Sequence, residues 1–132
     1  MRYALMILDA PHGGPAAQSA LRFARAAVAR GHRVTRVFFY GDGVLTGSQL
    51  ACPPQDEPDL RTGWREFAAA HGTELVLCIA AALRRGVLDE TERQRYEKSA
   101  AAIDPAFTLA GLGQLADAAL GCDRLLTFGS RA

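Results

Sequence analysis

Apolar residues follow two patterns along the chain, short continuous runs and stripes with helical spacing. Short apolar runs rich in β-branched and aromatic residues are typical of buried strands, and apolar residues three and four positions apart are typical of amphipathic helices. The runs, which predict strands, fall at residues 2–8, 34–40, 74–79 and 123–128. The stripes and other helix-favouring segments, which predict helices, fall at residues 16–30, 59–72, 79–83, from 89 onward, and 110–120.

Residues typical of helix ends support these boundaries. Gly31 and Gly72 follow the first two predicted helices, where glycine readily ends a helix. Asp59 is placed to cap the second helix, and Asp89 with Glu92 forms a capping-box-like start for a polar helix.

Strands and helices alternate along the whole chain, and this alternation predicts the fold class. It predicts an α/β fold with a mostly parallel sheet and helices on both faces, in a single domain over residues 1–132. In such sheets, ligands and chemistry collect at the carboxyl ends of the strands. Residues 41–58 form a long predicted loop at that edge, and loops of this length are often functional.

Composition and charge exclude several classes of protein. The chain has 132 residues, of which 49% are hydrophobic and 22% charged, so it is not intrinsically disordered. Its longest apolar run, Leu75–Leu83, is well short of the roughly twenty residues that a bilayer span requires. No secretory signal is evident after Met1, so a cytoplasmic protein without a membrane segment is expected.

The balance of ionisable groups argues against two kinds of ligand. Fifteen basic and fourteen acidic residues give a net charge of +1 without a basic stripe, so no direct nucleic-acid partner is expected. The three histidines are scattered without metal-ligand spacing, and the paired glycines Gly111 and Gly113 lack the rest of a dinucleotide motif. We therefore expect neither a metal nor an organic cofactor. The three cysteines, an odd number, are expected to be free thiols.

Cys78 is the strongest candidate for chemistry. It ends the third predicted strand and precedes a helix-favouring segment, with Arg84 and Arg85 one to two turns later. A helix start and nearby guanidinium groups both favour a thiolate, the nucleophilic form of cysteine. The alternative is a small buried hydrophobic residue within an apolar strand, since free cysteines are commonly buried.

The other candidates carry weaker signals. Cys122 precedes the last strand, at the opposite sheet edge, and is expected to be an interior thiol. Cys52 lies in the long loop, where a resolving thiol for Cys78 is one alternative and an incidental exposed cysteine is favoured. His12, in the first strand–helix loop, is either a site residue or a solvated side chain.

The spacing of Cys78 and Arg84 also matches the C-x5-R pattern of cysteine phosphatases. In that pattern, backbone amides and a guanidinium surround an oxyanion. The five intervening residues include three alanines and no glycine, which disfavours a loop that turns its amides inward. A phosphatase-like enzyme is thus the less favoured alternative.

Three segments of the sequence resemble the DsrE-like sulfur-relay family. They are residues 37–44, residues 78–87 followed by Asp89 and Glu90, and residues 111–115 together with 122–124. The resemblance implies an α/β sulfurtransferase domain without cofactors, with the active cysteine at Cys78 carrying a persulfide. Cys52 is not a residue of the family pattern, and the resemblance does not explain His12.

The same resemblance implies partners and a pathway. It implies assembly with two related subunits, of TusB and TusC type or of DsrF and DsrH type, into a heterohexamer. Sulfur would come from a TusA-like donor and pass to a TusE-like or DsrC-like acceptor. Its destination would be 2-thiolation of the wobble uridine of tRNA, or alternatively dissimilatory sulfur oxidation.

Overall fold

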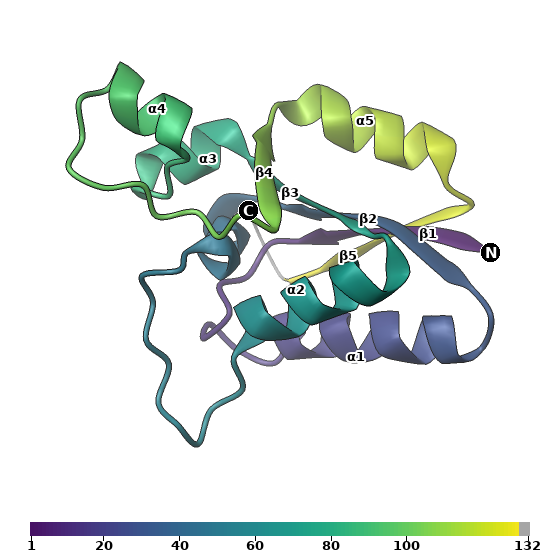
Figure 1. Ribbon diagram of the computed structural model, residues 1–132. Helices are drawn as coiled ribbons and strands as arrows, with labels where there is room; N and C mark the ends of the chain where they lie inside the picture. The colour runs from purple at the N-terminus through teal and green to yellow at the C-terminus, as the bar shows by residue number, and fades with distance from the viewer. Residues whose placement is uncertain (130–132) are drawn as a thin grey trace.

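The computed structural model describes residues 1–129, which form a twisted parallel sheet with helices on both faces (Figure 1). The sheet has five strands in the order β4-β3-β2-β1-β5, and every neighbouring pair is parallel. This arrangement confirms the predicted fold class. The strands are β1 (Arg2–Ile7), β2 (Arg33–Phe39), β3 (Glu74–Cys78), β4 (Phe107–Ala110) and β5 (Arg124–Phe128).

The helices lie in two groups around the sheet. Helices α1 (Ala16–Ala29) and α2 (Leu60–His71) cover one face, and α5 (Leu112–Gly121) lies over the other (Figure 1). Two short helices, α3 (Ile79–Arg84) and α4 (Glu90–Arg95), lie beyond the carboxyl end of β3. None of the helices within residues 1–129 is long and apolar enough to cross a membrane.

The predicted helix-ending residues adopt the expected roles. The Asp59 carboxylate accepts a hydrogen bond from the Thr62 amide at 3.2 Å, and Asp89 accepts one from the Glu92 amide at 2.8 Å. Gly72 ends α2 with a φ of 68°, a left-handed conformation that glycine adopts without a steric penalty. These contacts satisfy backbone groups that a helix leaves unpaired at its ends.

The main core lies between the sheet and the α1–α2 layer. Phe39 on β2 contacts Trp64 of α2 edge to face, with ring centroids 6.0 Å apart, and contacts Phe107 of β4 at 5.5 Å. Phe39 and Trp64 are fully buried. Buried aromatic residues contribute large apolar areas, so these contacts fix α2 against the strands that end near Cys78.

Two elements were missed by the sequence prediction. Strand β4 is only four residues long and lies at the sheet edge, where only one neighbour pairs with it, so its apolar pattern is too short to identify. The first part of the predicted loop is a 3-10 helix, η1 (Gly41–Gly47). It is held by backbone contacts that no local pattern reveals, such as the bond from the Gly43 amide to the Leu8 carbonyl at 3.1 Å.

Helix α5 covers its face of the sheet only thinly. The predicted apolar stripe of this helix packs inward only in part, because Leu115 is partly buried against the core while Leu112 is 55% exposed, and Ala118 is the residue of α5 that is buried. Leu120, at the end of the helix, is 86% exposed, and Leu125 of β5 is also exposed. The chain alone therefore leaves an apolar surface on α5 and β5.

Candidate functional site

Cys78 lies where β3 passes directly into α3. It is the last residue of the strand and the N-cap of the helix, so the chain turns at this position without an intervening loop. Its register partner on the edge strand is Ala110, the last residue of β4. The predicted place of Cys78, at the carboxyl end of a strand and the start of a helix, is confirmed.

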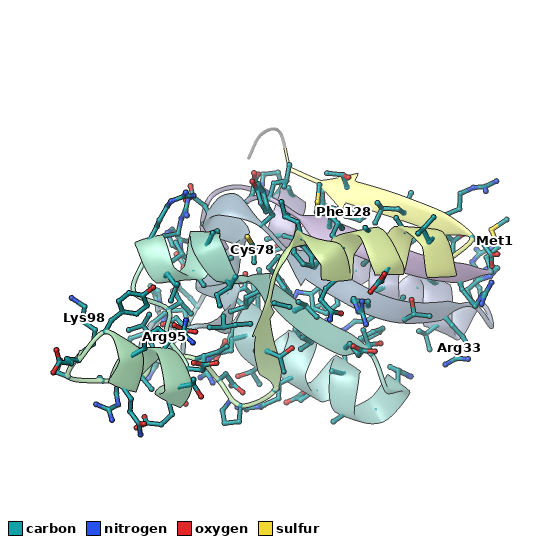
Figure 2. All side chains as sticks on the ribbon, turned by 90° about the horizontal axis from the view of Figure 1, so that it is seen from above. Met1, Arg33, Cys78, Arg95, Lys98 and Phe128 are labelled. Atoms are coloured by element: carbon teal, nitrogen blue, oxygen red, sulfur yellow. The ribbon has the colours of Figure 1, made fainter. Side chains whose placement is uncertain are left out.

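The side chain of Cys78 is buried in the chain alone. It is 4% exposed and belongs to the hydrophobic core cluster. Within residues 1–129, its Sγ makes no hydrogen bond. Figure 2 looks onto the face that carries α3 and α5 and shows Cys78 between these two helices. In the chain alone, Cys78 is thus packed as the alternative interpretation, a small buried residue, predicted. Any chemistry at its sulfur requires the residues that cover it to move.

The two arginines lie at the end of α3 opposite to Cys78, and the expectation that they support its thiolate stays a prediction. Cys78 precedes and Arg85 follows the six residues of α3, so about 10 Å of helical rise separates their backbones. The Nε atom of Arg85 lies 2.9 Å from Oδ1 of Asp42, and its Nη1 donates to the Ala81 carbonyl at 3.0 Å. Arg85 therefore joins α3 to η1. The side chain of Arg84 is exposed and makes no ion pair within residues 1–129.

This geometry also removes the phosphatase-like alternative. The residues after Cys78 form a helix, so their amides point along the helix axis and do not surround an anion beside the sulfur. Arg84 ends that helix and cannot close a cradle around the same position. The C-x5-R spacing is therefore coincidental in this fold.

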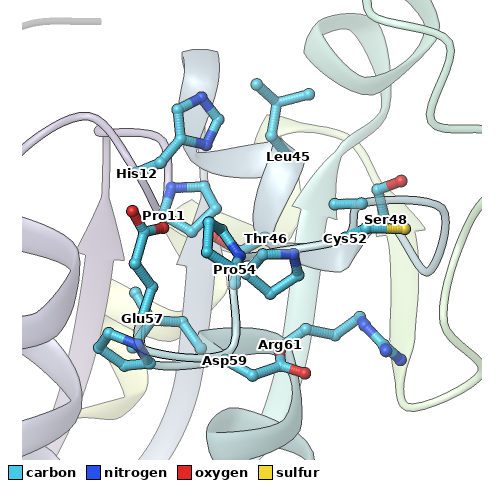
Figure 3. A pocket seen from close by; sticks show the side chains of 14 residues that line it. Pro11, His12, Leu45, Thr46, Ser48, Cys52, Pro54, Glu57, Asp59 and Arg61 are labelled. Carbon is cyan, nitrogen blue, oxygen red and sulfur yellow. The ribbon is translucent and has the colours of Figure 1, made fainter.

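Cys52 and His12 line a pocket of about 260 Å³ between the loop after β1 and the segment before α2 (Figure 3). The Sγ of Cys52 is exposed and lies 3.6 Å from the Leu50 carbonyl oxygen. In Figure 3, its sulfur and the His12 ring lie on opposite sides of the pocket. Cys52 is a free, exposed cysteine as favoured, and no disulfide joins it to buried Cys78.

Cys122 is half-buried, which differs from the interior position that was expected. Its Sγ lies 3.2 Å from the Arg124 carbonyl oxygen, just before β5 begins. It is the C-cap residue of α5. As predicted, Cys122 and Cys78 lie at opposite ends of the parallel strands. Cys122 precedes the amino end of β5, and Cys78 is at the carboxyl end of β3.

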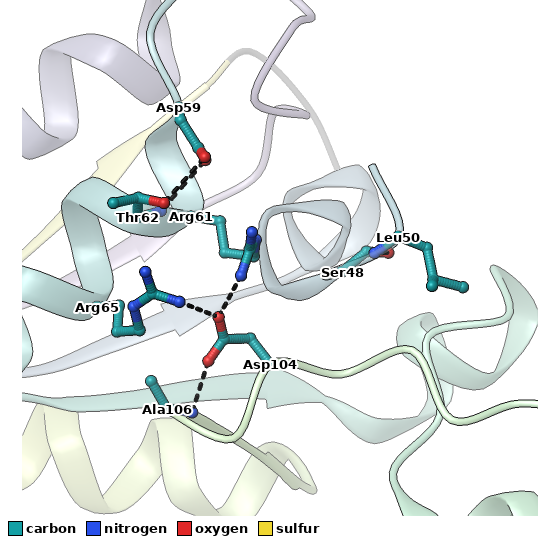
Figure 4. A network of polar contacts seen from close by, with 8 residues as sticks. All are labelled: Ser48, Leu50, Asp59, Arg61, Thr62, Arg65, Asp104 and Ala106. Carbon is teal, nitrogen blue, oxygen red and sulfur yellow. Dashed lines mark hydrogen bonds and ion pairs between the residues drawn. The ribbon is translucent and has the colours of Figure 1, made fainter. Parts of the chain in front are cut away.

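A buried carboxylate in the segment before β4 was not identified from the sequence. Asp104 is 1% exposed, and its Oδ2 lies 2.5 Å from Arg61 and 3.2 Å from Arg65 of α2 (Figure 4). Burial by itself raises the pKa of Asp104, but the Ala106 amide and the two guanidinium groups lower it below its ordinary value. The contact fixes the segment before β4 to α2. An isolated aspartate between a proline and an isoleucine carries no sequence signal for this role.

Within residues 1–129, no three histidine, cysteine, aspartate or glutamate side chains lie close enough to hold a metal ion. The fold and this site define a parallel α/β protein with one buried thiol at a strand–helix junction on the carboxyl edge of the sheet. The chain belongs to the DsrE/DsrF-like family, whose model matches residues 1–128.

Particular relatives extend this assignment. The chain is 50% identical over 128 residues to the sulfurtransferase TusD of Enterobacter sp. (strain 638), which covers 97% of this chain and 100% of that protein. The crystal structure of the ychN protein from E. coli matches with a TM-score of 0.77 at 22% identity, over 97% of this chain and 99% of that one. A conserved protein of unknown function from Bacteroides thetaiotaomicron matches with a TM-score of 0.52 at 15% identity, over 93% of each chain. The two structures support the fold.

Proposed function

We propose that this chain is a sulfurtransferase subunit of a sulfur relay and that Cys78 carries the sulfur as a persulfide. The observation that carries the proposal is the position of Cys78, the one cysteine of residues 1–129 at the carboxyl end of a strand and the start of a helix. The 50% identity to a sulfurtransferase over nearly the whole chain supports the same activity.

The proposed chemistry is thiol–persulfide exchange. The Cys78 thiolate attacks the outer sulfur of a donor persulfide, the donor's sulfur–sulfur bond breaks, and the donor leaves as a thiolate. Cys78 then carries the outer sulfur until an acceptor thiolate attacks it and Cys78 leaves as the thiolate. Each step exchanges one sulfur–sulfur bond for another, so the reaction balances without an oxidant, a metal or an organic cofactor.

Burial of Cys78 sets a condition on this chemistry. At 4% exposure, the sulfur of the chain alone cannot be reached by a protein-borne persulfide. We propose that the cover between α3 and α5 opens transiently, which admits a small persulfide slowly, and that a bound carrier protein holds it open. The thin packing of α5, in which only Ala118 is buried, makes this helix the element of the cover that moves most readily.

The apolar surface of α5 and β5 supports assembly with other subunits. Leu112, Leu120 and Leu125 are exposed large hydrophobic residues on neighbouring elements. Exposed apolar surfaces of this kind mark protein interfaces. The proposed partners are the two related subunits of a cytoplasmic heterohexamer and the donor and acceptor carriers that the family resemblance implies. We propose tRNA wobble-uridine 2-thiolation as the destination of the sulfur, because the full-length relative is named TusD.

Replacing the proposed sulfur carrier tests this function. Cys78→Ser should abolish the gain of one sulfur atom, seen by intact mass spectrometry after incubation of the assembled complex with glutathione persulfide. Cys52→Ser and Cys122→Ser are matched controls that should retain the mass gain. Because serine is nearly isosteric with cysteine, the circular dichroism spectrum and the assembly state should not change.

Two results would overturn the proposal. One is a sulfur adduct that persists in Cys78→Ser and maps to another cysteine. The other is wild-type Cys78 that never gains sulfur in the complex and resists alkylation by iodoacetamide.

A further inference from the structure

An apolar groove with a cationic rim lies at the end of α3 that is farther from Cys78. It has a volume of about 480 Å³. Figure 2 shows Lys98, one of its lining residues, on the side of the molecule that carries α3 and α4. The groove is lined by Leu83, Arg84, Gly86, Leu88, Tyr96, Lys98, Ser99 and Ala100.

The charges of the groove are all of one sign. Arg84 and Lys98 line it, no carboxylate does, and neither cation forms an ion pair within residues 1–129. The neighbouring arginines differ, because Arg93 pairs with Glu90 at 2.6 Å and Arg85 with Asp42 at 2.9 Å. The groove therefore presents two uncompensated cations, which favour a ligand with carboxylates.

The lining of the groove also favours a ligand that carries an apolar group. Leu83 and Leu88 contribute apolar side chains, and the ring of Tyr96 is 51% exposed at its wall. Tyrosine rings in open apolar pockets are typical anchors for protein partners. A free inorganic anion would contact the cations but leave this apolar lining in water.

The backbone around the groove is held in place. The Val87 amide donates to the Ala82 carbonyl at 2.9 Å, and Gly86 has a φ of 73°, which suits the tight turn after α3. The Lys98 amide donates to the Arg93 carbonyl at 2.9 Å, and Nη1 of Arg93 donates back to the Lys98 carbonyl at 3.0 Å. A groove formed before binding loses less entropy when its partner is bound.

We propose that this groove docks a peptide segment of the carrier protein that exchanges sulfur with Cys78, and that the segment carries an apolar side chain next to carboxylates. This inference rests on the proposed function. The length of α3 sets the distance between the groove and Cys78. Six helical residues span about 9 Å, which an extended peptide covers in about three residues. The carrier's reactive cysteine is therefore expected about three positions from the apolar and acidic residues that occupy the groove.

A synthetic peptide tests the groove directly. The probe is a fluorescein-labelled peptide with serine in place of the reactive cysteine, two glycines, a leucine and two glutamates. Its control has two lysines in place of the glutamates. By fluorescence anisotropy with the full chain, the acidic peptide should bind about tenfold more tightly than the control.

Charge reversal in the groove should reverse this preference. Lys98→Glu should weaken binding of the acidic peptide by about tenfold and improve binding of the lysine peptide. Arg22→Glu, an equal charge change on α1 across the sheet, should change the binding of neither peptide. Lys98→Gln removes the charge without reversing it and serves if Lys98→Glu does not fold. Lys98 is the chain's only lysine, so a carbodiimide cross-link from the peptide should map to it.

The outcomes separate this inference from the proposed function. If the peptides bind equally, or if Lys98→Glu and Arg22→Glu have the same effect, the groove is not the docking site. Glutathione persulfide should load Cys78 equally in wild type and Lys98→Glu, because that small donor does not depend on the groove. If Cys78 loads while the acidic peptide fails to bind, the docking inference alone is wrong. If Cys78 loads in neither protein, the proposed function is wrong.

Discussion

At the residue scale, the burial of Cys78 and its proposed reactivity make opposite demands. Packing in the core holds the strand–helix junction in one geometry, which a reaction between two sulfur atoms requires. The same packing hides the sulfur except when its cover opens transiently or is held open by a bound partner. A buried thiol of this kind reacts slowly with small persulfides and oxidants in the resting protein and becomes fully available when its carrier is bound.

Asp104 is the residue at which a single charge change should affect stability most clearly. Asp104→Asn should lower the free energy of unfolding by about 2 kcal/mol at neutral pH, since it removes charge-assisted bonds from Arg61 and Arg65. Urea denaturation measures the change. Asp56→Asn, at an exposed aspartate in the loop before α2, is the control and should change stability little.

The same variant should show a defined pH dependence. Because the folded protein lowers the pKa of Asp104, its contribution is fully present above the unfolded value and is lost as pH falls through the lowered folded value. The stability difference between wild type and Asp104→Asn should therefore be constant near neutral pH and shrink in strong acid. A difference that grows on acidification would contradict the ion-pair assignment.

At the element scale, η1 depends on a close approach between two backbones. A Cβ atom at Gly43 would lie 2.2 Å from the Ile7 carbonyl oxygen at the end of β1. Gly43→Ala should therefore destabilise the protein by about 1–3 kcal/mol, because two backbones must separate. Gly113→Ala, in α5, is the control, since nothing lies within 4 Å of its added Cβ. Thermal unfolding followed by circular dichroism compares them, and equal midpoints would contradict the close packing.

Elements differed in how well their sequence revealed them. The long helices, their caps at Asp59 and Asp89 and the four strands β1, β2, β3 and β5 could be predicted, because each has a local periodic or capping signal. The strand β4 could not, because four residues at a sheet edge carry almost no periodicity. The helix α5 was predicted as amphipathic, but part of its apolar side, including Leu112, faces solvent, since periodicity indicates which residues share a face and not what covers that face.

At the scale of the whole molecule, the exposed apolar surface should be an interface. Leu120→Asp should leave the unfolding midpoint of the chain alone unchanged, because Leu120 is 86% exposed. It should prevent co-purification with the two related subunits proposed above, since a carboxylate would be buried unpaired at the interface. Gln18→Asp, on the exposed side of α1, is the control. Size-exclusion chromatography of co-expressed subunits measures assembly, and an intact complex with Leu120→Asp would show that α5 is not its interface.

The sequence by itself determined the parallel α/β fold class and the place of Cys78 at the junction of a strand and a helix, because both follow from local patterns of a few residues. Only the tertiary structure decided that the thiol is covered, that Arg85 pairs with Asp42 and not with the sulfur, and that Arg84 and Lys98 meet in one groove. These features depend on contacts between residues far apart in the chain. Such contacts form only when the elements pack, so no local pattern contains them.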